Sequence, residues 1–173
     1  MTELRKNNFL IKFLLFAPIL ILYISVLNNF DFNYLGLKYF SFNFSYILIF
    51  YYGLKKSYGL GYINIFIAGL INDVVVGTPI GISSLTYLLL CGVAAYLRNI
   101  TLRPNLMKDW IFFLFTILVL NCLSFMVLNL IFNYQVSFND QLINVAFTFL
   151  LYFIFSHVFN FFEDILIGAH NVR

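Results

Sequence analysis

Long apolar runs separated by short polar stretches dominate the chain. They cover residues 13–27, 39–54, 60–76, 82–97, 110–132 and 142–159. The runs are continuous rather than alternating, and inside a bilayer only a helix satisfies all of its own backbone hydrogen bonds. A crossing takes roughly 20 residues, so the shorter second and fourth runs predict tilt or interfacial ends. The pattern predicts an all-α integral membrane protein, with six transmembrane helices in a single domain over residues 1–173.

Lysine and arginine fall almost entirely on one side of this predicted arrangement. Nine of the ten lie at the termini or in loops on the side of the amino terminus, and only Lys38 lies on the other side. Short loops rich in Lys and Arg stay in the cytoplasm. The distribution therefore predicts that both termini are cytoplasmic.

Composition excludes several classes of function. The chain is 62% hydrophobic and 10% charged, whereas a soluble domain carries about 25% charged residues. Six helices in 173 residues leave no room for a large catalytic or nucleotide-binding module. The net charge of +3 fits a basic inner rim against anionic lipid headgroups, so we expect contact with the bilayer and none with nucleic acid.

Small and polar residues inside the predicted helices indicate where helices pack together. They are frequent in the third, fourth and fifth runs, and we expect these three helices to form the centre of the bundle. The sixth run predicts a polar stripe facing its neighbours, with residues at steps of four: Asn144, Thr148, Tyr152, Ser156 and Asn160. A polar substrate pocket is the alternative interpretation of the same residues.

Catalytic and metal-binding patterns are missing from the sequence. His157 has no second His, Cys or acidic residue at ligand spacing, which favours a hydrogen-bonded structural histidine. The chain has no His-x-x-Glu-His type motif, no Gly-x-Ser-x-Gly elbow and no Gly-rich phosphate loop with its lysine. We therefore expect no enzymatic activity, no metal and no cofactor.

A short segment between the third and fourth runs is rich in turn-forming residues. It reads Gly77-Thr-Pro-Ile-Gly81. The two glycines supply freedom in φ, and Pro79 favours the start of the next helix. Asp73, near the end of the third run, is placed either to accept hydrogen bonds from the first amides of the fourth helix or to contact a basic group of a partner.

Residues 68–85 resemble the signature of the MreD family, the bacterial rod shape-determining membrane proteins. The pattern is G-L-x-x-D-x-x-x-G-x-P-x-G-x-x-x-L, and the resemblance extends over residues 47–98. Size, six helices and a cytoplasmic amino terminus agree with it over the whole chain. Residues 51–57 depart from it, because they lack the proline expected after the family's aromatic pair. Carried over position by position, the motif residues are Gly69, Asp73, Gly77, Pro79 and Gly81.

The resemblance implies a membrane scaffold of the cell-elongation complex in the bacterial cytoplasmic (inner) membrane. Such a scaffold binds MreC, a single-span protein, and works beside the RodA glycosyltransferase, its transpeptidase and, indirectly, MreB filaments. It supports side-wall peptidoglycan synthesis and rod cell shape. MreD is similar in architecture to the substrate-binding membrane subunits of energy-coupling-factor vitamin transporters, so such a subunit is the alternative. It would need a pocket near the outer face, lined by residues such as Asn121, Tyr152 and Asn144.

Overall fold

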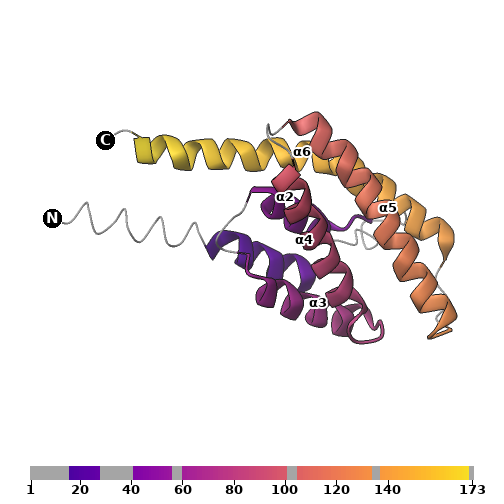
Figure 1. Cartoon of the computed structure of the whole chain (residues 1–173). Coiled ribbons are helices and arrows are strands. Elements are labelled where there is room, and N and C mark those ends of the chain that lie inside the picture. The colour runs from indigo at the N-terminus through magenta and orange to yellow at the C-terminus, as the bar shows by residue number, and fades with distance from the viewer. Residues whose placement is uncertain (1–15, 28–40, 56–59, 101–104, 134–136, 172–173) are drawn as a thin grey trace.

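The computed structural model describes residues 16–27, 41–55, 60–100, 105–133 and 137–171, and the side chains of these residues as far as Phe162. Within them the fold is all-helical, and the six predicted helices are present (Figure 1). Two of these helices contain a stretch that is long and apolar enough to cross a membrane, Leu106–Leu130 and Phe138–Phe162. The helices are Phe16–Leu27, α2 (Phe44–Lys55), α3 (Tyr62–Val76), α4 (Ile82–Ile100), α5 (Leu106–Leu130) and α6 (Phe138–Asn171).

The starts of α2, α5 and α6 differ from the predicted positions by four or five residues, and polar residues explain each of these differences. α2 begins at Phe44, where the carbonyl oxygen of Asn43 accepts the first hydrogen bonds; residues 39–40 lie outside the described part. α5 begins four residues early, because the Asn105 side chain accepts a hydrogen bond from the backbone N–H of Met107 at 3.1 Å. α6 also begins early, after Ser137, whose hydroxyl is hydrogen-bonded to the Asp140 carboxylate.

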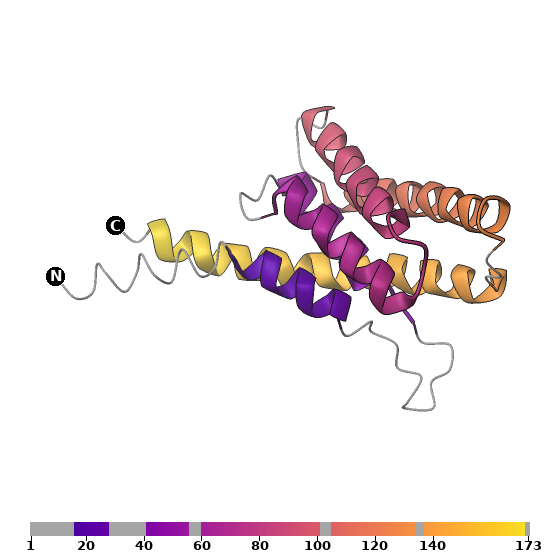
Figure 2. The same cartoon turned by 90° about the horizontal axis from the view of Figure 1, so that it is seen from below.

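α6 is much longer than predicted at its carboxyl end. Its 34 residues correspond to about 51 Å at 1.5 Å per residue, well beyond the ~30 Å of a hydrocarbon core. In Figures 1 and 2 its carboxyl-terminal part extends past the other helices. The apolar stretch alone therefore predicted only the part of α6 that packs in the bundle.

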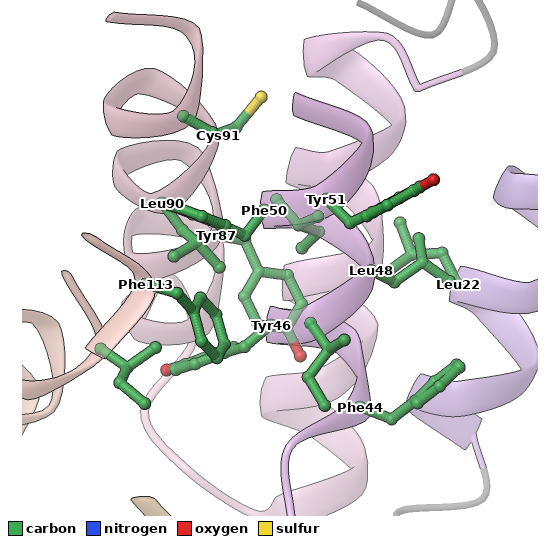
Figure 3. Close-up of a cluster of buried hydrophobic side chains, with 14 of the residues drawn as sticks. Leu22, Phe44, Tyr46, Leu48, Phe50, Tyr51, Tyr87, Leu90, Cys91 and Phe113 are labelled. Atoms are coloured by element: carbon green, nitrogen blue, oxygen red, sulfur yellow. The ribbon is translucent and has the colours of Figure 1, made fainter. Parts of the chain in front are cut away.

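The centre of the bundle is α2 together with α4, so the prediction that the third, fourth and fifth helices form it is right for the fourth helix and wrong for the third and fifth. Every residue of α2 from Phe44 to Tyr51 is buried, whereas α3 buries only one face. Figure 3 shows Tyr46 and Phe50 of α2 beside Tyr87 and Leu90 of α4. A short helix that is apolar on all sides is best placed in the middle, where every side finds a neighbour.

Glycines let neighbouring helices approach closely at two points. A Cβ atom on Gly53 of α2 would lie 2.8 Å from the Cβ of Ala94 in α4. A Cβ atom on Gly69 of α3 would lie 2.4 Å from the Cα and 2.6 Å from the backbone N of Ser84 in α4. The second contact involves backbone, which cannot rotate away, so α3 and α4 pack at a distance that requires glycine at position 69.

The polar stripe of α6 faces its neighbours, as predicted. The Thr148 hydroxyl oxygen accepts the backbone N–H of Asn43 at 2.9 Å. The Asn160 side-chain oxygen accepts the Tyr51 hydroxyl at 2.9 Å, and the Tyr152 ring stacks on Phe113 of α5 with 4.3 Å between centroids. These contacts join α6 to α2 and α5.

The outward faces of the helices are strongly apolar. Leu130 of α5, Ile63 of α3 and Phe161 of α6 are each at least 65% exposed. Only 28% of each of the two longest apolar stretches is buried inside the protein. Exposed apolar surface on this scale needs a lipid or protein partner, because monomeric soluble proteins expose only small apolar patches.

The contact at Gly69 gives a matched pair of stability predictions. Gly69→Ala forces α3 and α4 apart, so we expect a loss of about 1 to 3 kcal/mol in the free energy of unfolding. Gly92→Ala is the control, because no atom lies within 4 Å of the added Cβ, and better helix propensity should leave stability equal or slightly higher. Unfolding of the two purified variants in detergent measures the difference. Equal stability of both would contradict the close approach.

Candidate functional site

The Asp73 carboxylate joins the end of α3 to the start of α4. It is fully buried. One oxygen, Oδ2, accepts the backbone N–H of Gly81 at 2.7 Å. The other, Oδ1, accepts the backbone N–H of Ser83 and the hydroxyl of Thr78, each at 2.9 Å. The predicted hydrogen bonds to amides at the start of the fourth helix are thus confirmed, and the Thr78 hydroxyl adds a third donor.

The backbone around the turn depends on its two glycines. Gly77 ends α3 with φ of +77°, and its N–H donates to the Asp73 carbonyl oxygen at 2.9 Å. Gly81 has φ of +107°. Residues other than glycine rarely adopt such φ values, so both positions favour glycine, as the sequence predicted. Pro79 lies between them, three residues before the first residue of α4, and its carbonyl oxygen accepts the N–H of Ile82.

Two further hydrogen bonds hold α3 and α4 side by side behind the turn. The Asn72 amide donates to the Ser83 hydroxyl oxygen at 2.9 Å. The Ser84 hydroxyl donates to the carbonyl oxygen of Phe66 at 3.0 Å, beside the close contact at Gly69. Together with Asp73 these groups form the turn cluster, which is defined here as Gly69, Asn72, Asp73, Gly77, Thr78, Pro79, Gly81, Ser83 and Ser84.

The structure therefore brings all five predicted motif residues into one place, with different tasks. Asp73 binds the turn, Gly77 and Gly81 shape it, and Gly69 permits the close approach. Sequence reasoning gave Asn72 and Ser84 only a general packing role and gave Thr78 and Ser83 none. The sequence did contain a signal for this role, because short polar side chains such as Asn, Ser and Thr beside a turn often form hydrogen bonds to nearby backbone or side chains.

A cavity of about 300 Å³ lies at the end of the bundle that carries this turn. We call it the turn-end cavity. Its wall includes Thr78 and Ser83 of the turn cluster and residues of α2, α4, α5 and α6. The lining residues are Ser41, Asn43, Tyr46, Thr78, Ile82, Ser83, Thr86, Asn121, Ser124, Leu128, Asp140, Gln141 and Asn144.

A second cavity of about 230 Å³ lies near the opposite end, between α2, α5 and α6. We call it the opposite-end cavity. Lys55 and Asp109 bring a positive and a negative charge to its lining. Tyr152 lines this cavity and not the turn-end cavity, so the prediction that Tyr152 shares a pocket with Asn121 and Asn144 is wrong. The reason is distance, because Tyr152 is eight positions after Asn144, which corresponds to about 12 Å of helix.

Residues that could bind a metal do not converge in the described part of the chain. No group of three or more His, Cys, Asp or Glu side chains is placed to hold an ion there. His157 has the hydrogen bond expected of a structural histidine, with Nδ1 3.0 Å from the carbonyl oxygen of Phe153 on its own helix.

The geometry of Asp73 predicts that asparagine is a poor substitute. The carboxylate accepts three hydrogen bonds, whereas an amide replaces one oxygen by an NH₂ group that must face a buried donor. We expect Asp73→Asn to lower the free energy of unfolding by about 1 to 3 kcal/mol. Thr78→Val removes a single donor, so about 0.5 to 1.5 kcal/mol is expected. Chemical unfolding in detergent tests this order, which a fully stable Asp73→Asn variant would contradict.

Comparison with known proteins found no relative of this chain. None of the family models, curated protein sequences and solved structures that were compared with the chain matches it.

Proposed function

We propose that the chain is a non-enzymatic membrane scaffold of the MreD type. In this proposal it holds an MreC-like single-span protein beside a RodA-type glycosyltransferase and its transpeptidase in the bacterial cytoplasmic membrane. The proposed work is support of side-wall peptidoglycan synthesis and rod shape.

The observation that carries the proposal is the turn cluster. The sequence signature that resembles MreD is built here around one buried carboxylate, so its residues have a common structural purpose. Ile80, at the apex of this turn, is 74% exposed and apolar. A rigid turn that presents an apolar side chain is suited to contact with another protein.

The strongly apolar exterior also supports a membrane location. We infer that all six helices cross or enter the bilayer with both termini in the cytoplasm. Helices with mostly exposed apolar faces need lipid or protein around them. Short polar loops and helix ends then provide the remaining contact surface for soluble partners.

Reporter fusions test this topology. Because nine of ten basic residues are placed on one side, a fusion after Arg173 and another within residues 98–108 should both report the cytoplasm. A fusion within residues 134–140 should report the exterior. An exterior signal from the fusion within residues 98–108 would overturn the proposed orientation.

Co-purification tests the scaffold. The tagged chain, extracted from its native cells in mild detergent, should recover an MreC-like protein and the transpeptidase. Ile80→Ser should reduce this recovery about five- to tenfold if the turn contacts the partner, because apolar contacts at an interface centre carry much of the affinity. Leu130→Ser is the matched control, since Leu130 is 71% exposed at the end of α5 and does not belong to the turn between α3 and α4. Equal loss in both variants would contradict a specific contact at the turn.

The turn-end cavity supports a second candidate, a substrate-binding membrane subunit of a vitamin transporter. Asn121 and Asn144, two of the three residues expected in such a pocket, line this cavity. The same co-purification separates the two candidates. Recovery of paired ATPases with a bound vitamin, in place of the elongation proteins, would favour the transporter subunit.

A further inference from the structure

The turn-end cavity has an unusual balance of charge. Among the described residues that line it, Asp140 is the one charged side chain, and none is a lysine, arginine or histidine. The opposite-end cavity differs in this respect, because Lys55 stands there with Asp109. A site with a carboxylate and no cation disfavours phosphate and carboxylate ligands and favours a positively charged group.

Several hydroxyl groups that line the same cavity already donate their proton in a hydrogen bond within the protein. The Thr86 hydroxyl donates to the carbonyl oxygen of Ser83, and the Ser124 hydroxyl donates to that of Leu120. The Thr78 hydroxyl donates to Asp73. A hydroxyl has one proton and two lone pairs, so each of these oxygens keeps the capacity to accept.

The Asn121 side chain also offers the cavity a hydrogen-bond acceptor. Its amide nitrogen donates to the carbonyl oxygen of Ile117 on its own helix at 2.8 Å, which leaves the amide oxygen as its acceptor. Asn43 and Gln141 bring further amides, which both donate and accept. The lining is therefore rich in acceptors, with a few donors.

An ammonium group matches such a lining, because it carries three donors, a positive charge and no acceptor. The volume of about 300 Å³ is at the lower limit of small-molecule pockets and exceeds what a bare metal ion fills. The side-chain amides of Asn43 and Gln141 can bind hydroxyl groups on the rest of the ligand, because they both donate and accept hydrogen bonds. We propose that the turn-end cavity binds a small organic ammonium compound that also carries hydroxyl groups.

This proposal goes beyond the scaffold function and does not depend on it. The two tests have separate readouts, since co-purification measures protein partners and the following experiment measures a small ligand. The turn cluster connects them structurally, because Thr78 and Ser83 belong both to that cluster and to the cavity wall.

Three hexose probes that differ mainly in charge test the ligand class. Glucosamine, glucose and glucuronate are titrated against the full chain in detergent, at a slightly acid pH that protonates the amine. Ligands that bind only the folded state raise its apparent stability, so thermal unfolding reports binding. We expect glucosamine to bind about two- to fivefold more tightly than glucose, because the Asp140 carboxylate is exposed and solvent screens its contact with an ammonium group, and glucuronate to bind least. Glucuronate equal to glucosamine, or no stabilisation by any of the three, would overturn the proposal.

Variants locate the binding. Asp140→Asn should remove the preference for glucosamine over glucose, whereas Asp109→Asn, which alters the carboxylate of the opposite-end cavity, should leave it unchanged. Asn121→Leu should weaken glucosamine binding through loss of the amide oxygen, and it keeps the test decisive if Asp140→Asn does not fold. An unchanged preference in Asp140→Asn, or unchanged affinity in Asn121→Leu, would place the ligand elsewhere and contradict the proposal.

Discussion

The buried carboxylate of Asp73 is the group on which the relative position of α3 and α4 depends. The first N–H groups of any helix have no partner within that helix. In an apolar surrounding, each unsatisfied group costs several kcal/mol, so the start of α4 needs acceptors from outside itself. Asp73 provides two oxygens for Gly81, Ser83 and Thr78. The backbone of Asp73 belongs to α3. The hydrogen bonds that it accepts from these donors therefore also fix where α4 begins relative to α3.

The rest of the bundle is assembled on that pair of helices. Gly69 allows α4 to lie directly against α3, and Gly53 allows α2 to lie against the other part of α4. α2 is then enclosed by α4 and α6, with the helix Phe16–Leu27 contributing Ser25, whose hydroxyl is 2.8 Å from that of Ser45. In the proposed bilayer location no hydrophobic force drives helices together, so such close contacts and interhelical hydrogen bonds would hold them in place.

The two cavities at opposite ends of this bundle differ in what they offer a ligand. One has opposite charges on Lys55 and Asp109, and the described lining of the other has the carboxylate of Asp140 among amides and hydroxyls. The turn cluster stabilises the wall of the latter and also presents Ile80 at the surface. A scaffold contact and a ligand site would thus share one structural element, which offers a physical route for a bound ligand to affect a partner.

The sequence alone determined the features that local chemistry decides. Six apolar runs predicted six helices, and Asp73, Gly77, Pro79 and Gly81 predicted the turn, because the groups that form it lie within ten residues of each other. Contacts between distant segments were decided only by the tertiary structure. Nearly every helix is apolar, so hydrophobicity did not reveal that α2 lies at the centre. Nor did it show that Asn43 bonds to Thr148, 105 residues away, or that Asn121 and Tyr152 line different cavities. These depend on which helix faces meet, and that is set by the sum of many contacts across the whole bundle.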